Sequence, residues 1–209
     1  MIEVMIAHAY RLRYDNGIAG GHMSTIEAIA RARRRKRLSI AEVARRSGLQ
    51  ASNLSAIEGG SREPTARNLD RAARGAGLHL VVADLGGRHP VTEVADAVAA
   101  SGEDEWGKAR LLVQLANDLA VADPFAKLLL AAEAPRSLSP EWDAAMAGIV
   151  EWRLEQVALP SPEWVIHTIG DPRWKWSIWP GTVRAEADDV PEPLLRRGVW
   201  LAEHELESV

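Results

Sequence analysis

The chain has 209 residues, of which 47% are hydrophobic and 26% are charged, a composition typical of a globular protein. Cysteine is absent, which excludes disulfides and thiolate metal sites, and no apolar run approaches the roughly 18 residues that a membrane helix needs. We therefore expect a cytoplasmic protein with no membrane contact. The net charge of −4 conceals a division. Residues 24–83 carry twelve Arg or Lys against five Asp or Glu, whereas residues 84–209 carry eleven against 22. Such a split predicts two domains with different partners, the basic one suited to a polyanion.

The first domain is predicted to span residues 23–84, after a weakly ordered extension over residues 1–22. Four short helices are expected, over residues 24–36, 39–47, 51–58 and 64–75. Ser39 can cap the second helix, and Gly48 can end it because glycine tolerates a left-handed backbone. The apolar segment Leu78–Ala83 then predicts a short strand.

The second domain is predicted to span residues 91–209, after a Gly-rich linker over residues 85–90. Apolar residues at helical spacing predict helices over residues 91–100, 103–121, 124–133 and 140–159, with caps that include Ser139 and Asp123. Beyond them, six prolines break any long element, so the last fifty residues should be irregular. Seven of the eight tryptophans follow Pro140.

Residues 39–64 carry a recognisable arrangement of small and turn residues. Ala44 is small where two helices would cross, Gly48 lies at the turn, and Ile57-Glu58 is followed by an Arg-x-Pro sequence at residues 62–64. The segment resembles the Cro/repressor-type helix-turn-helix family, also called the xenobiotic response element family. It departs from that family at Ile40 and Ala51, where glutamine is usual. The resemblance implies a DNA-binding domain whose helix over residues 51–58 enters the major groove, which is wide enough to admit a helix.

The predicted recognition helix has polar residues but no Arg or Lys. Its candidate base-contacting residues are Gln50, Ala51, Ser52, Asn53 and Ser55. Amides can bind adenine, and hydroxyls can bind bases or phosphates. The affinity for double-stranded DNA must then come from neighbouring cations, for which Arg45, Arg46 and Arg62 are candidates. The basic run over residues 33–37 is a further candidate, or else a solvated helix face.

The acidic domain offers two interpretations of its tryptophans. They could pack over the helices, or they could form a partner-binding surface through Trp174, Trp176 and Trp179. The region around Asp171-Pro172-Arg173, Trp179-Pro180 and residues 195–201 resembles the C-terminal region of actinobacterial helix-turn-helix proteins encoded beside nucleotidyltransferase-like toxins. The resemblance implies an antitoxin with a cognate toxin as its partner. The sequence departs from those proteins at Trp174-Lys175-Trp176, where an arginine segment rich in aromatic residues is usual.

No sequence feature indicates an enzyme. The histidines lack metal-ligand spacing, and no Gly-rich phosphate loop or Gly-x-Ser-x-Gly motif occurs, so neither a metal nor a cofactor is expected. We expect a mainly α protein, with an N-terminal helix-turn-helix bundle and a helical C-terminal domain that includes a Trp- and Pro-rich irregular segment.

Three functions fit these predictions. The first is a sequence-specific transcriptional regulator that is the autoregulating antitoxin of a toxin–antitoxin pair. The alternative is a stand-alone regulator whose C-terminal domain binds a small molecule in a Trp-lined pocket, and the third is an adaptor without DNA binding. A homodimer is expected, through Leu78–Ala83 or the second domain, because one helix-turn-helix unit covers a single half-site.

Overall fold

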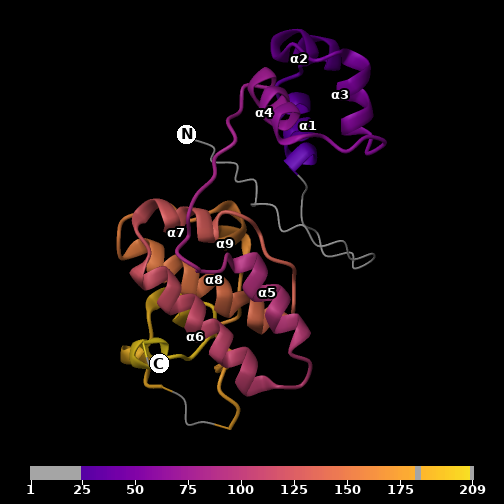
Figure 1. Ribbon diagram of the computed structural model, residues 1–209. Helices are drawn as coiled ribbons and strands as arrows, with labels where there is room; N and C mark the ends of the chain where they lie inside the picture. The colour runs from indigo at the N-terminus through magenta and orange to yellow at the C-terminus, as the bar shows by residue number, and fades with distance from the viewer. Residues whose placement is uncertain (1–24, 182–184, 208–209) are drawn as a thin grey trace. The chain divides into compact units, whose positions relative to one another are not determined.

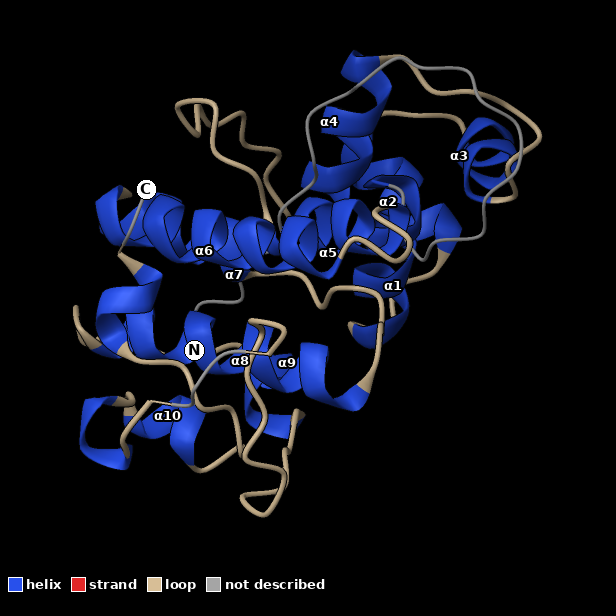
Figure 2. Ribbon diagram, turned by 90° about the horizontal axis from the view of Figure 1, so that it is seen from below, coloured by secondary structure: helices blue, strands red, loops and turns tan. Residues whose placement is uncertain are grey.

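The structure is a computed structural model that describes residues 25–181 and 185–207 (Figure 1). Its contacts divide the chain into two compact units, Met1–Val82 and Ala83–Val209. Within the described residues it forms ten α-helices and two short 3-10 helices, and the only β pairing there is one isolated bridge (Figure 2). The predicted mainly α fold class is therefore confirmed. Among these helices, none is long and apolar enough to cross a membrane. The extension predicted over residues 1–22 lies outside the described part.

The N-terminal unit contains four helices around a small core. They are α1 (Thr25–Arg35), α2 (Ile40–Ser47), α3 (Ala51–Glu58) and α4 (Ala66–Gly75). Eight buried residues form the core, and half of them are alanines. The small side chains let α2 and α4 approach closely. A Cβ atom added to Gly75 would lie 2.7 Å from the carbonyl oxygen of Val43, so this position leaves no room for a side chain.

The predicted helix boundaries in this unit depend on local hydrogen bonds, and several are confirmed. The Ser39 hydroxyl accepts a hydrogen bond from the amide of Glu42, as an N-cap does. Gly48 ends α2 with a φ of 67°, and its N–H group donates to the carbonyl of Ala44. The next helix begins three residues later, so the chain reverses between α2 and α3 at the predicted turn.

The strand predicted over Leu78–Ala83 is wrong. These residues form a loop, in which Leu78 and Leu80 pack against the N-terminal core while the side chains of Val81 and Val82 are 60% and 93% exposed. A strand needs a partner for its backbone hydrogen bonds, and no described segment of the chain supplies one. Of this apolar segment, only the side chains of Leu78 and Leu80 contribute to the core.

The C-terminal unit contains the remaining helices. They are α5 (Val91–Ala100), α6 (Glu105–Val121), α7 (Pro124–Ala131), α8 (Pro140–Glu155), α9 (Glu163–His167) and α10 (Glu192–Leu195), with 3-10 helices η1 (Ala187–Asp189) and η2 (Glu203–Leu206). Asp123 caps α7 as predicted. Ser139 lies at the N-cap of α8 without a capping bond, because its hydroxyl donates to Glu141. The segment predicted as a linker contacts this unit, since Leu85 packs on its core.

Helix α8 is the centre of the C-terminal unit. Every residue from Ala144 to Leu154 is buried, because α6, α7, α9 and α10 all contact this helix. A helix that is buried on all faces needs mostly apolar or small residues, and its two buried charged residues, Glu151 and Arg153, are hydrogen-bonded. Gly148 shows how tight the packing is, since an added Cβ would lie 2.5 Å from a Leu194 methyl carbon.

The irregular C-terminal segment is held by one buried ion pair. The Arg197 guanidinium, 5% exposed, donates to Glu151 of α8 at 2.5 Å and to the carbonyl oxygens of Val165, Thr168 and Pro193. A single side chain thus joins α8, α9 and α10. The prolines predict this irregularity correctly, but they do not predict its organisation around Arg197.

Candidate nucleic-acid interface

Helix α3 is held in place by its inner face and its C-terminal end. Leu54 belongs to the unit's core, and Ile57 is buried as well. At the end of the helix, Glu58 accepts two hydrogen bonds from Arg33 of α1, at 2.9 and 2.7 Å, and Arg33 also donates to the carbonyl of Leu38. The side chains of Arg33 and Glu58 are 12% and 6% exposed. The hydrogen bond to Glu58 raises the pKa of Arg33. The helix is therefore fixed relative to α1 by a bidentate, mostly buried ion pair.

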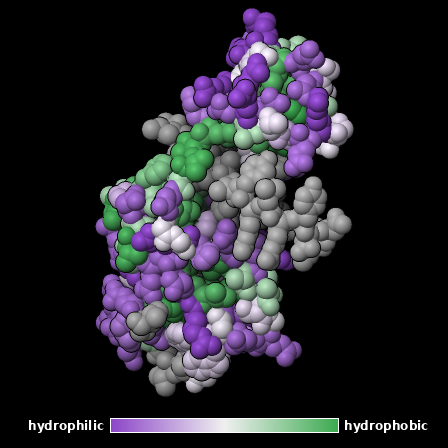
Figure 3. Space-filling model, viewed as in Figure 1, coloured by the Kyte–Doolittle hydropathy of each residue, from purple (hydrophilic) through white to green (hydrophobic). Residues whose placement is uncertain are grey.

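The outer face of α3 is polar and exposed. Gln50, Ala51, Ser52 and Ser55 are all exposed, and the N-terminal unit presents mainly hydrophilic residues in Figure 3. Gln50 lies at the N-cap but makes no capping bond, so its amide is not used by the helix. The face offers amide and hydroxyl groups that the fold does not require, together with the Ala51 methyl group.

Asn53 and Arg62 form a pair beside this face. Arg62 Nη1 donates to the Asn53 side-chain oxygen at 3.0 Å, and both residues lie at the surface, Asn53 half-buried and Arg62 exposed. The bond orients the amide of Asn53 and places a cation next to the recognition helix. It links a predicted base-contacting residue to a predicted phosphate-contacting one.

Arg45 and Arg46 extend from the C-terminal half of α2, where both bind Glu42. The distances are 2.5 Å from Arg45 Nη2 and 2.7 Å from Arg46 Nε to the two carboxylate oxygens. These hydrogen bonds lower the pKa of Glu42. The arginine side chains are 74% and 49% exposed, and exposed ion pairs of this kind are weak. A phosphate can therefore replace Glu42 as the partner of either arginine.

The basic run over residues 33–37 is only partly available at the surface. Arg33 binds Glu58 inside the fold, so a phosphate contact by Arg33 would have to replace this pair. Lys36 donates to the carbonyl oxygens of Ala76 and Gly77, at the C-terminal end of α4. Arg34, Arg35 and Arg37 are exposed. The run thus stabilises the N-terminal unit as well as adding surface charge.

The predicted partner-binding tryptophans lie in the C-terminal unit. Trp174, Trp176 and Trp179 are each half-buried and pack against its core. Trp176 meets Trp142 edge to face, with 5.2 Å between ring centroids, and Trp179 lies 5.5 Å from Trp106. Their packing role is therefore evident, and any partner contact would use only the remaining exposed edges.

Comparison with known proteins agrees with the geometry of the N-terminal unit. Residues 27–85 match a family model described as a helix-turn-helix domain. The chain thus contains a helix-turn-helix domain. That domain supports a DNA-binding regulator of transcription. No curated protein and no solved structure shows a significant match to the chain.

The contacts of two acidic residues in the site, Glu42 and Glu58, were not predicted. Glu42 and the two arginines are three and four residues apart, a spacing that places them on one helix face, so this cluster could have been found from the sequence. The partner of Arg33 is 25 residues away. No local pattern indicates which of five acids in the domain it would choose.

Proposed function

We propose that the protein is a sequence-specific transcriptional regulator of the Cro/repressor type that contacts bases through α3. The observation that carries the proposal is the outer face of α3. Its amides and hydroxyls are exposed, while Leu54, Ile57 and the Arg33–Glu58 pair hold the helix rigidly from behind. Side chains on a rigid element contact bases in a defined register, which is what specificity needs.

Phosphate contact is assigned to Arg45, Arg46 and Arg62, which flank that face. Because α3 itself has no cation, these residues supply the electrostatic part of the affinity. Arg45 and Arg46 precede the recognition helix in the chain, and Arg62 follows it and binds Asn53 of that helix. Phosphate contacts position the protein on the duplex, and base contacts then give specificity.

A homodimer fits this mode of binding. One four-helix unit covers one half-site, and two copies would bind a palindromic operator. The exposed valines at positions 81 and 82 offer one dimer contact, because exposed apolar side chains can pack against those of a second copy. Light scattering of the full chain, with and without operator DNA, tests this. A monomeric mass in both samples would contradict it.

The acidic unit is assigned to a toxin partner, which makes the protein an antitoxin that represses its own operon. The support is electrostatic. Residues 84–209 have a net charge of −11, so DNA repels them. A toxin that handles RNA or nucleotides needs a basic site, which an acidic partner can bind. The exposed edges of Trp174, Trp176 and Trp179 would contribute apolar contacts.

Co-expression tests the antitoxin role. The full chain is expected to rescue growth of cells that express the gene product encoded next to it, and to co-purify with that product. Disrupting DNA binding through Ser52→Ala with Asn53→Ala should leave the rescue intact, because a different unit carries it. Failure of rescue with a folded, co-expressed chain would contradict the antitoxin role without affecting the DNA-binding role.

One observation favours the alternative, a regulator with a small-molecule-binding C-terminal domain. A cavity beside Trp142 lies entirely within the C-terminal unit. Pockets of its size commonly bind small ligands.

A further inference from the structure

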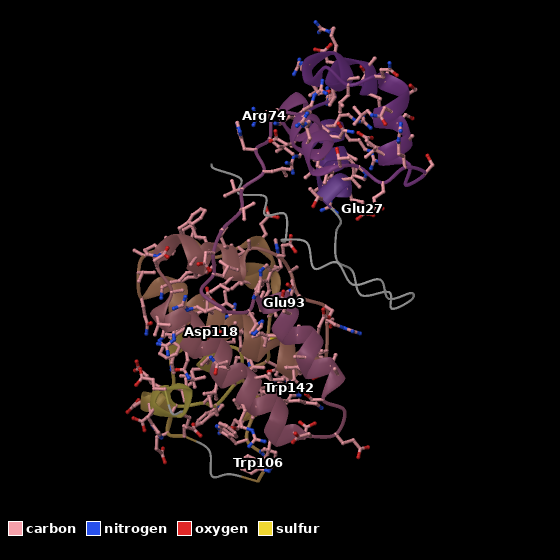
Figure 4. All side chains as sticks on the ribbon, viewed as in Figure 1. Glu27, Arg74, Glu93, Trp106, Asp118 and Trp142 are labelled. Carbon is pink, nitrogen blue, oxygen red and sulfur yellow. The ribbon has the colours of Figure 1, made fainter. Side chains whose placement is uncertain are left out.

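The cavity in the C-terminal unit has a volume of about 380 Å³. It lies between the end of α5, the first turn of α6 and the loop that leads into α8, and Figure 4 labels Trp142 in its wall. Val98 and Leu138 add aliphatic side chains to the indole surface of Trp142. These side chains form the smaller, apolar part of the wall, and the larger part is polar, so the wall can contact one edge of an apolar group.

Every charged residue that lines this cavity is a cation. Lys108 and Arg136 are the two, although the C-terminal region has twice as many acidic as basic residues. Lys108 Nζ lies 6.0 Å from the centroid of the Trp142 ring, so the cation and the aromatic surface border the same space. The charge of the lining residues is positive, whereas the net charge of the C-terminal region is negative, and this favours an anionic occupant.

The existing partners of both cations are solvated and exchangeable. Lys108 lies 2.6 Å from Glu105, whose side chain is 45% exposed, and Arg136 lies 4.0 Å from Asp96, which is 46% exposed. The Arg136–Asp96 pair is exposed on both sides, and such pairs contribute little; its 4.0 Å separation is also long for a hydrogen bond. An anion inside the cavity can therefore compete directly for Arg136, and for Lys108 by displacing a carboxylate that is 45% exposed.

The walls are held in place without a ligand. Asp143 accepts hydrogen bonds from the Leu138 amide at 2.9 Å and the Ser137 hydroxyl at 2.5 Å, which fixes the loop on the first turn of α8. Trp142 is 8% exposed and packs against Trp176. A preformed site avoids the entropy cost of ordering its walls when it binds.

We propose that this cavity is a binding site for a small organic anion, with a carboxylate between Lys108 and Arg136 and an apolar body against Trp142, Val98 and Leu138. This inference rests on the alternative function, a regulator whose C-terminal domain binds a small molecule. The test of ligand binding does not depend on DNA binding, because occupancy of the cavity is measured directly.

The experiment uses 2-naphthoate as the probe and neutral 2-naphthamide as its matched control, titrated into the full chain by calorimetry. We expect the carboxylate to bind at least about tenfold more tightly than the amide, because a hydrogen bond to a charged group contributes about 1.5 to 3 kcal/mol. Lys108→Met and Arg136→Met should each remove about that factor. Arg110→Met, which removes an exposed cation of α6 outside the cavity, should leave the affinity unchanged.

Nuclear magnetic resonance of the unmodified chain locates the probe even where a variant fails to fold. The expected result is that naphthoate shifts the backbone amide signals of Val98, Gly102 and Ser137. No binding, equal binding of the amide, or signal changes confined to other parts of the chain would each overturn the proposal. A loss of DNA binding in a separate assay bears only on the regulator function.

Discussion

The two units use their charged residues in opposite ways. In the N-terminal unit one ion pair, Arg33–Glu58, is mostly buried, and the other arginines named in the interface are exposed. In the C-terminal unit Arg197, Glu151 and Arg153 are all at most 9% exposed and hold secondary structure elements together. Charged and polar side chains that the fold does not use are the ones available for a partner. The polar groups of α3 are thus available to a partner, whereas Arg197 is used by the fold.

The cores differ as well. The N-terminal core has eight buried residues, whereas the C-terminal core has thirty, including two tryptophans. A small core gives a small margin of stability. The same loss of free energy should therefore unfold the N-terminal unit more readily than the C-terminal one.

The largest effect is expected at the buried ion pair of the C-terminal unit. Arg197→Met leaves Glu151 with one partner fewer in a buried place and removes three bonds to carbonyl groups, so the free energy of unfolding should fall by about 3 to 5 kcal/mol. Chemical denaturation followed by tryptophan fluorescence measures it. Arg173→Met, which breaks a pair whose arginine is 89% exposed, is the control and should leave stability unchanged within error. Equal effects of the two substitutions on the free energy of unfolding would show that Arg197 does not stabilise the C-terminal unit as argued above.

A smaller loss is expected at the ion pair of the N-terminal unit. Arg33→Met should lower the stability of that unit by about 2 to 3 kcal/mol, because Glu58 is left mostly buried and unpaired. Specific DNA binding should weaken with it, since α3 is no longer fixed. Arg34→Met removes a neighbouring exposed cation and should affect stability little. Circular dichroism melting and fluorescence anisotropy measure the two properties, and an Arg33 variant that keeps full stability would contradict the account.

The smallest effect is on the salt dependence of DNA binding. Neutralising Arg45, Arg46 and Arg62 to glutamine should weaken binding to all DNA sequences alike and reduce the slope of log K against log salt by about one for each lost phosphate contact. Arg173→Gln supplies the control, an exposed and ion-paired arginine of the other unit. An unchanged slope in the triple variant would place these arginines away from DNA.

Local sequence patterns predict the helix caps and turns of this protein, but they do not predict contacts between residues that are distant in the sequence. The caps at Ser39 and Asp123 and the turn at Gly48 each depend on residues within four positions, so they were predictable. The strand over residues 78–83 was not, because a strand depends on a partner elsewhere. The pairing of Arg33 with Glu58 likewise joins distant positions.

The surroundings of the tryptophan side chains also could not be predicted from local sequence patterns. Their clustering in an irregular segment is compatible with packing and with partner contact. Only the tertiary contacts of Trp176 with Trp142 and of Trp179 with Trp106 reveal that much of their surface is used within the unit. The recognition helix was easier to predict, since its exposed polar residues and its two buried ones follow helical spacing.

The central claim, that α3 contacts bases, is tested most directly by the ratio of affinities for the chain's own upstream DNA and for random DNA of equal length. Ser52→Ala with Asn53→Ala should reduce the specific affinity by about 1 to 3 kcal/mol per good base contact while changing non-specific affinity little. Ser52→Ala alone leaves the Asn53–Arg62 bond in place and should lower the ratio less. A ratio that stays constant because both affinities fall together would show that these residues contact only phosphate, and a ratio near one in the unmodified chain would contradict sequence-specific recognition altogether.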